Sequence, residues 1–219
     1  MTVCLSCQKE IETSWRYCRY CGAPNQARAD PPEPEAESIL VPPDLVAQLV
    51  PSSEMGGWLN KTLVVEHGHA GLLLVEGRFD TRLDPGKHTI GNLLRSRPRN
   101  TSVAIIRTSD LPLDLSVPRL LTSDPLPLAL DLRVTVSIER PELFWVNLVR
   151  GAVAYSQENL ASAVYPNVEE AAEAFTRQHS IKDLDADRGL GESLNMAAAV
   201  GAQPTFSRWG LRLVSIRAA

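Results

Sequence analysis

The 219-residue sequence predicts an α+β protein in which a small cysteine-rich module precedes a larger domain of antiparallel strands and helices. Three observations support this class. All four cysteines lie in the first 21 residues. Apolar and polar residues alternate over residues 126–139, as in a strand with one buried face. Helical spacing then extends over residues 141–199, and alternation returns at 211–216.

The cysteines form two CxxC pairs. Ten residues separate the pair Cys4 and Cys7 from the pair Cys18 and Cys21. Two such turns can direct four sulfurs at one point, which is the tetrahedral set that zinc accepts. Gly22 follows the second pair, where such a turn often needs a positive φ. Because four thiolates fill the coordination shell, we predict a structural Zn²⁺ ion bound by Cys4, Cys7, Cys18 and Cys21.

Two other interpretations of four cysteines are a disulfide pair and an iron site. Disulfides are typical of exported proteins, and the N-terminus lacks the apolar segment of a secretory signal. The module has few residues that could form an apolar core. A metal would therefore supply much of its folding free energy, on the order of 10 kcal/mol. Residues 17–24 resemble the zinc ribbons that open many bacterial multi-domain proteins, and such ribbons mostly contact other proteins.

The charge distribution argues against nucleic acid as a partner of the larger domain. The formal net charge is −4, and the imbalance lies in residues 24–51, which hold one basic and five acidic side chains. No domain-wide basic field remains to attract phosphates. A local alternative is a nucleic-acid- or protein-binding adaptor acting mainly through the ribbon. In it, two arginines among three aromatic residues would stack on bases: Arg16, Arg19, Trp15, Tyr17 and Tyr20.

Between the ribbon (residues 1–25) and the main domain (residues 57–219), residues 26–56 are predicted to form an acidic, proline-rich linker. Such a composition cannot bury enough apolar area to order itself, so an extended spacer is expected. Residues 44–50 have helical spacing. We expect one or two helical turns there, docked on the main domain.

The first half of the main domain is predicted to consist of strands. Residues 62–66 and 72–76 are β-rich, and the glycines between them suggest a hairpin. A turn at residues 84–87 and strands at 102–108 and 111–117 follow. The strand at 126–139 is expected to pair antiparallel, because a parallel strand would be apolar on both faces.

Helices are predicted after this long strand. Pro141 suits a first helical turn, which continues over residues 142–149. Two further helices are expected at residues 158–164 and 168–179, with Pro166 breaking the chain between them. Residues 181–199 are rich in alanine and mostly helical. The alternating run 211–216 closes the domain as a strand.

Several phrases, taken in order, resemble the stomatin–prohibitin–flotillin (SPFH, or band 7) domain family over about residues 63–217. They are Val64-Val65-Glu66 with the run 71–75, Gly77 with the run 83–88, Thr122-Ser123-Asp124 with the run 126–138, Pro141, and Trp209-Gly210-Leu211 with the run 213–216. The order of these phrases is more specific than any one of them.

The resemblance implies a non-enzymatic scaffold that forms large assemblies, usually on membranes, and organises client proteins. A homo-oligomer with a client protein of unknown identity is therefore expected. Members of the family usually carry a membrane-inserting segment before the domain and a long coiled coil after it. Here a ribbon and a linker precede the domain, and the sequence ends at Ala219. With no apolar run long enough to span a bilayer, the protein is predicted to be cytoplasmic, with membrane contact peripheral to the inner face.

Three further groups of side chains are candidate sites. His67 and His69 could hold a metal on one side of a strand, but a solvated turn is the simpler interpretation. The cluster Arg95, Arg97 and Arg99 could contact lipid phosphates or an acidic neighbour, or could be a solvated loop. The alternating Asp183, Asp185 and Asp187 are interpreted as helix-capping charge. No catalytic or cofactor-binding constellation is predicted.

Overall fold

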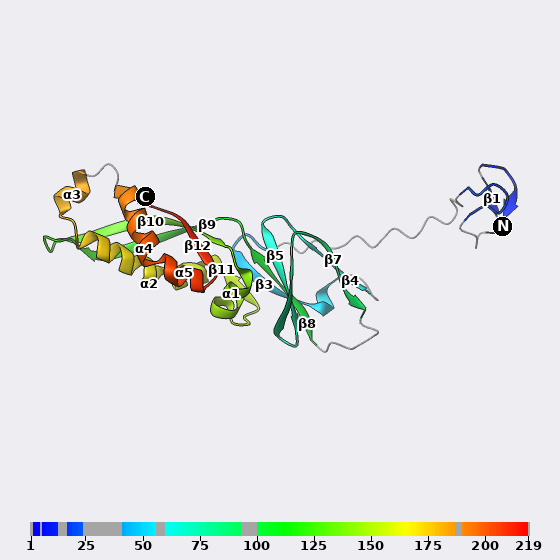
Figure 1. Ribbon diagram of the computed structural model, residues 1–219, viewed down its shortest axis with the longest axis horizontal. Coiled ribbons are helices and arrows are strands. Elements are labelled where there is room, and N and C mark those ends of the chain that lie inside the picture. Colours follow the sequence, from blue (N-terminus) through cyan, green and yellow to red (C-terminus); the bar gives the residue numbers. More distant parts are fainter. Residues whose placement is uncertain are drawn as a thin grey trace. The chain divides into compact units, whose positions relative to one another are not determined.

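The computed structural model describes residues 2–4, 6–12, 17–23, 41–55, 60–92, 100–186 and 190–218. The chain divides into two compact units, Met1–Ala36 and Glu37–Ala219 (Figure 1). Each unit has its own buried core. The predicted class, a cysteine cluster followed by a mixture of antiparallel sheets and helices, is confirmed.

The first unit contains one short antiparallel pair, β1 (Thr2–Val3) with β2 (Glu10–Ile11). Its described core is equally small. Cys4, Ile11 and Cys18 are buried, and Cys7 and Ala23 pack against them. Because most of these side chains are thiols, folding removes little apolar area from water, too little to stabilise such a short module.

The second unit begins with a five-stranded antiparallel sheet in the order β11-β3-β8-β5-β6. Its strands are β3 (Leu45–Pro51), β5 (His69–Val75), β6 (Arg78–Leu83), β8 (Thr101–Arg107) and β11 (Ala154–Ser156). Residues 103–106 of the central strand β8 are all buried. The sheet is covered on both faces there, which explains the continuous apolar run in this strand.

The helical turns predicted for residues 44–50 are wrong, because this segment is strand β3, followed by the 3₁₀ turn η2 (Ser52–Glu54). Val46 and Ala47 contact the larger core of the unit, and Val50 contacts a smaller one. Backbone pairing with β8 on one side and β11 on the other outweighs the local helical spacing. Residues 45–51 thus belong to the sheet, although the sequence placed them in the linker.

A two-stranded sheet of β4 (Asn60–Val65) and β7 (Gly86–Asn92) encloses the smaller core. The strands expected at residues 62–66 and 72–76 are both present, but the hairpin between them is wrong. β4 pairs with β7, whereas β5 pairs with β6 and β8. A Cβ added to Gly71 would lie 3.3 Å from the Val65 side chain. The Val65 side chain of β4 therefore packs over β5 at this glycine, and a larger residue at position 71 would push the two strands apart.

A three-stranded antiparallel sheet in the order β12-β10-β9 forms the other half of the unit. Its strands are β9 (Leu111–Leu121), β10 (Pro127–Ile138) and β12 (Leu211–Ala218). The long alternating strand predicted at residues 126–139 and its antiparallel pairing are confirmed. On its inner face, Leu132, Val134, Val136 and Ile138 are at most 2% exposed.

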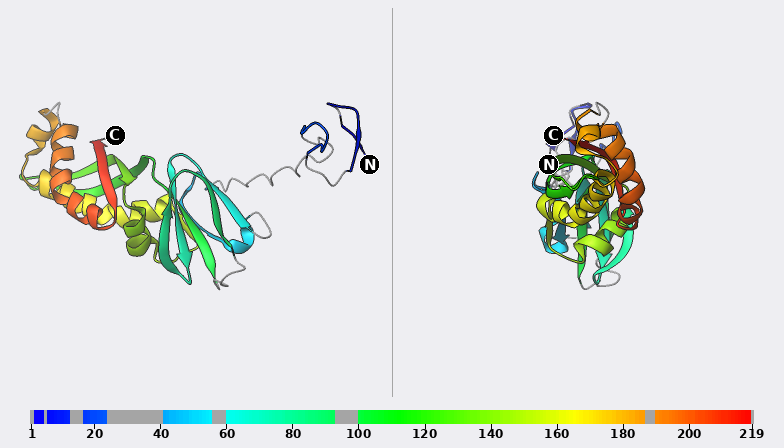
Figure 2. Two further views of the ribbon diagram at one scale, coloured as in Figure 1. Left: turned by 45° about the vertical axis from the view of Figure 1, so that its right-hand side comes forward. Right: turned by 90° about the vertical axis from the view of Figure 1, so that its left-hand side faces the viewer.

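The helices of this unit are α1 (Pro141–Phe144) with the π-helical turn η3 (Trp145–Val149), α2 (Gln157–Thr176), α3 (Ile181–Ala186), α4 (Leu190–Gly201) and α5 (Gln203–Arg208). Of these, α2, α4 and α5 cover one face of the three-stranded sheet (Figure 2, yellow to red). α2 packs on β9, and α4 packs on β12 and α2. The result is a two-layer α/β arrangement with one solvated sheet face.

The helix break predicted at Pro166 is wrong, because α2 continues through it. Leu160, Val164, Val168 and Ala172 follow one another at four-residue spacing, and each is at most 1% exposed. This uninterrupted buried stripe stabilises the helix on both sides of the proline. It offsets the one backbone hydrogen bond that Pro166 cannot donate.

Candidate metal centre

Two equivalent turns bring the cysteines together. In the first, the Gln8 N–H donates to the Cys4 carbonyl (2.8 Å) and the Cys4 N–H donates to the Lys9 carbonyl (2.9 Å). In the second, the Gly22 N–H donates to the Cys18 carbonyl and the Cys18 N–H to the Ala23 carbonyl, both at 2.8 Å. Each CxxC pair is therefore held by the same two backbone hydrogen bonds.

The same turn requires the same backbone conformation after each pair. Gly22 has φ of +73°, which confirms the conformation expected for it, and Gln8 has φ of +57°. A left-handed conformation costs a residue with a Cβ roughly 1 kcal/mol or more, and glycine almost nothing. The first turn is therefore strained at Gln8, a feature that the sequence analysis missed because glutamine does not mark such a position.

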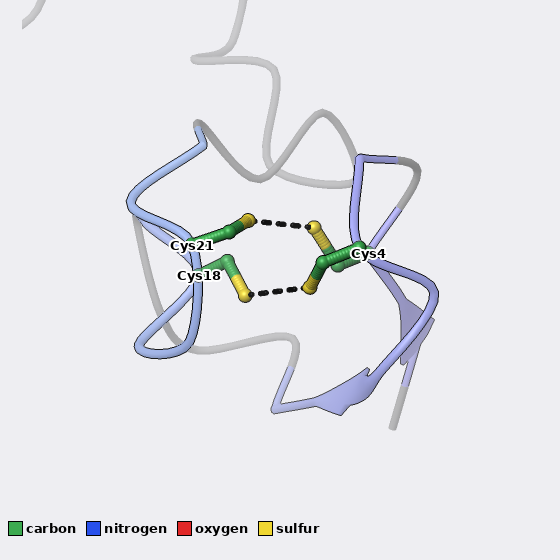
Figure 3. Close-up of side chains that lie close together, drawn as sticks. Cys4, Cys18 and Cys21 are labelled. Carbon is green, nitrogen blue, oxygen red and sulfur yellow. Dashed lines mark hydrogen bonds between the residues drawn. The ribbon is translucent and has the colours of Figure 1, made fainter.

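The four sulfurs converge on one point (Figure 3). The Sγ atoms of Cys4 and Cys21 lie 3.7 Å apart, and those of Cys7 and Cys18 lie 3.6 Å apart. All four ligand atoms lie within 4.8 Å of one another. Zinc–sulfur bonds of about 2.3 Å in a tetrahedron place the sulfurs roughly 3.8 Å apart. The cluster therefore has the dimensions and the donor set of a four-thiolate metal site.

The electrostatics of the cluster favour a cation. The Lys9 N–H lowers the pKa of the Cys7 thiol, but burial and the other three thiols outweigh it and raise that pKa to about 12. Burial raises the pKa of the Cys18 thiol, but the N–H groups of Tyr20 and Cys21 and the neighbouring sulfurs lower it to about 7. Four thiolates this close repel one another, and a divalent cation removes that repulsion.

The surface of this unit carries aromatic and basic side chains. Tyr17 and Tyr20 are 64% and 47% exposed. The Lys9 Nζ and the Arg19 guanidinium lie 4.7 Å and 4.8 Å from the centre of the Tyr20 ring, which they flank as cation–π partners. Sequence reasoning had not included Lys9 in this group. Trp15 and Arg16 lie outside the described residues.

Comparison with protein-family models decides the nature of the second unit. The model of the SPFH domain / Band 7 family matches residues 63–218, well over half of the chain. This chain belongs to the SPFH domain / Band 7 family. The resemblance found in the sequence is thereby confirmed. Domains of this kind are of the membrane-associated scaffold type, and members of the family are generally non-enzymatic. Among curated proteins, no match was found.

In the SPFH domain, the phrase Thr122-Ser123-Asp124 ties the β9–β10 turn to the start of α3. The Thr122 hydroxyl donates to Asp124 (2.5 Å), the Asp124 carboxylate accepts the Ile181 N–H (3.3 Å), and the Ser123 N–H donates to the His179 carbonyl (2.9 Å). The Thr122 hydroxyl holds the pKa of Asp124 below its usual value. This phrase therefore has a structural role.

The capping role expected for the aspartates is borne out at Asp183. Its carboxylate accepts the Ser180 hydroxyl (2.7 Å) and the Ser180 N–H (3.1 Å), and its own N–H donates back to the Ser180 hydroxyl (3.2 Å). This is a capping box at the start of α3, and the Ser180 hydroxyl lowers the pKa of Asp183. Nothing is described of the Asp185 side chain, and Asp187 lies outside the described residues.

The phrase Trp209-Gly210-Leu211 forms a close backbone crossing in the SPFH domain. Gly210 has φ of +77°, and its carbonyl accepts the N–H groups of Glu139 and Arg140 (3.0 and 3.1 Å). A Cβ at this position would lie 2.2 Å from the Arg140 carbonyl oxygen. Only glycine can connect α5 to β12 while the end of β10 passes this close.

The remaining candidate groups do not form a second cluster. His67 is exposed in the turn between β4 and β5, and His69 is half-buried at the start of β5. Within the described ranges, the four thiols are the one group of three or more potential metal ligands that comes together. Arg95, Arg97 and Arg99 lie outside the described residues. No helix in the described part of the chain is both long and apolar enough to cross a bilayer.

Proposed function

We propose that this chain is a non-enzymatic scaffold whose SPFH domain self-associates and whose ribbon docks partner proteins. The observation that carries the proposal is the family match over residues 63–218, which spans most of the second unit. In this proposal the protein is cytoplasmic, homo-oligomeric and peripheral to the inner face of a membrane, and it recruits a client protein still to be identified.

The metal of the ribbon is proposed to be a structural Zn²⁺ ion bound by Cys4, Cys7, Cys18 and Cys21. The sulfur spacing fits zinc, and four protein thiolates leave no coordination position for a substrate or a water molecule. The exposed Val3, Tyr17 and Tyr20 then give the metal-stabilised module a surface for protein contacts, in which aromatic residues are enriched.

Sedimentation of the zinc-loaded full chain over a wide concentration range tests self-association, and flotation with anionic and neutral vesicles tests the membrane role. We expect assembly that grows with concentration, and flotation that is stronger with anionic vesicles. A strict monomer at the highest concentration would overturn the scaffold proposal. Failure to float with either vesicle would overturn only its membrane part.

A nucleic-acid adaptor acting through the ribbon is the second candidate, and the cations around the Tyr20 ring favour it. A base that stacks on the exposed Tyr20 ring would displace one of these cations from the ring, and the displaced side chain would contact a phosphate. Binding to single-stranded oligonucleotides that weakens steeply with salt and is lost in Tyr20→Ala would favour this function. Residues 1–23 carry three basic and two acidic side chains, which favours protein docking instead.

A further inference from the structure

A groove separates strand β9 from helix α2. It has a volume of about 200 Å³ and is lined by residues 114–116 of β9 and by Glu158, Ala161, Ser162 and Tyr165 of α2. Asp114 and Ser116 project from the exposed face of the sheet, whereas Leu115 between them points into the core that α2 covers. A cavity lined both by outward-facing residues and by the helix can lie only along the edge of the strand. Within the described residues, β9 pairs with β10 alone, so this edge has no strand beside it.

Backbone groups of β9 point toward this groove. Along an antiparallel strand, every second residue directs its N–H and carbonyl away from the neighbouring strand. Pro112 is at such a position, because its carbonyl accepts the side-chain amide of Gln157 from α2. Asp114 and Ser116 follow at the same phase, and no group of the described residues binds their outward N–H and carbonyl groups. These two residues present the alternating donors and acceptors with which an added strand pairs.

Proline limits the length of this open edge. Pro112 and Pro118 lie at the same phase as the two outward-facing residues and have no N–H to donate. A long strand therefore cannot continue its pairing in either direction, which opposes aggregation through the edge. A short strand can still pair with the stretch between the prolines. Its side chains on the α2 side would meet the partly buried Ala161 and Tyr165.

The helix beside the groove is acidic. α2 has no lysine or arginine, and it carries the four glutamates Glu158, Glu169, Glu170 and Glu173. Glu158 is exposed and lines the groove. In the described part of the chain, no basic side chain forms an ion pair with Glu158. The helix side of the groove therefore favours a positively charged partner.

The outer face of the sheet places a further carboxylate at the same position along β9. Asp131 of β10 lies directly opposite Ser116, and both residues are exposed. The neighbouring Asp114 already accepts the Arg133 Nε–H at 2.8 Å, whereas Asp131 has no ion-pair partner within the described ranges. Arg119 lies beyond the second proline and does not line the groove. Both sides of this edge thus present a carboxylate that a basic side chain can neutralise.

We propose that a short, extended, basic segment of a partner protein adds to β9 as a fourth strand of this sheet, in the groove beside α2. Side chains opposite Asp114 and Ser116 then project on the outer face, where an arginine or lysine reaches Asp131. The intervening side chains project toward α2, where apolar residues contact Ala161 and Tyr165. This inference goes beyond the proposed function, because it gives the SPFH domain a partner site that is independent of the ribbon and of self-association.

The test measures binding of a fluorescein-labelled peptide, Thr-Arg-Val-Arg-Val-Arg-Thr, to the zinc-loaded full chain by fluorescence anisotropy. We expect saturable binding that weakens with salt, and no binding of the peptide with glutamate in place of arginine. Methylation of the arginine backbone nitrogens removes the N–H groups that face β9 and should weaken binding at least about tenfold. Methylation of the valine nitrogens, which face away from β9, is the matched control and should change the affinity little.

Two protein variants test the position of the peptide. Ser116→Pro removes an outward N–H and should weaken binding about tenfold. Because Pro112 and Pro118 occupy equivalent positions in the same strand, this variant should fold, which circular dichroism checks. Asp131→Asn should weaken binding about threefold, and the matched control Asp80→Asn, an exposed carboxylate on β6, should bind as the parent does.

Equal effects of the two methylation patterns would overturn the inference, because binding would then reflect charge alone. Unchanged binding to a folded Ser116→Pro variant would overturn it too, since the peptide would lie elsewhere. If that variant folds poorly, the methylated peptides still decide the question on the parent chain. Loss of self-association in Ser116→Pro would assign the groove to a second copy instead of a partner protein. A peptide that fails to bind would overturn this inference and leave self-association, which sedimentation measures, unaffected.

Discussion

In the ribbon, the buried side chains described are Cys4, Ile11 and Cys18, whereas the SPFH domain buries a core that extends from β3 to β12. The ribbon therefore depends on a ligand for its stability, and the SPFH domain depends on packing. The difference shows how one chain can join a module whose fold needs a bound metal to a domain whose fold does not. The following experiments test that contrast.

Removal of the metal should have the largest effect, and only on the ribbon. A strong chelator under reducing conditions removes a binding free energy on the order of 10 kcal/mol, so the ribbon should unfold. In ¹H–¹⁵N spectra, the amide signals of residues 2–4, 6–12 and 17–23 should collapse to unfolded positions while those of the SPFH domain persist. A single Cys18→Ser variant should imitate the chelator. Dispersed ribbon signals after complete metal removal would contradict the contrast.

Gly210→Ala should have the largest effect on the SPFH domain. The added Cβ would meet the Arg140 carbonyl oxygen at 2.2 Å in a left-handed conformation, so we expect a loss of about 3 kcal/mol or more, measured by denaturant unfolding. Gly77→Ala is the matched control, because Gly77 has a similar φ of +76° but no atom within 4 Å of its added Cβ. Its loss should be about 1 kcal/mol. Equal losses would show that the close crossing is unimportant.

Gln8→Gly should strengthen metal binding by the four cysteines. Glycine removes the cost of the left-handed conformation, about 1 kcal/mol, which corresponds to roughly a fivefold gain in affinity. The reciprocal change, Gly22→Gln, should weaken binding by a similar factor. Competition with a chromophoric chelator measures both. The two variants must change the metal affinity in opposite directions. A loss of affinity in both would show that the two turns are not equivalent.

Low pH should lower the stability of the SPFH domain, because two carboxylates become protonated where the β9–β10 turn contacts the start of α3. Because the pKa values of Asp124 and Asp183 are lowered in the folded state, their stabilising contribution is present above about pH 4. It is lost as the pH falls through the folded-state values. Asp124→Asn with Asp183→Asn should flatten the fall of the melting temperature below about pH 4. An unchanged slope would exclude these two carboxylates as its source.

Local sequence patterns correctly predicted the elements whose structure is determined mainly by their own residues. The alternation from 126 to 139 identified β10, and the order of family phrases identified the SPFH domain. The spacing of the thiols predicted a cluster that the structure brings together. The alternation and the thiol spacing each repeat a chemical property along a short stretch of chain, and they report directly which side chains share a face or a point.

Tertiary structure decided what depends on partners distant in the sequence. Residues 45–51 became a strand because β8 and β11 pair with them, and β4 joined β7 rather than β5. A buried stripe kept α2 continuous through Pro166. The side-chain oxygens of Asn195 and Gln203 accept N–H groups of the edge strand β12, which follows them in the chain. Backbone pairing, and packing between elements far apart in the sequence, contribute free energy that no local periodicity contains. The four-cysteine module was therefore predicted from its spacing, whereas strand partners and covered faces required the assembled fold.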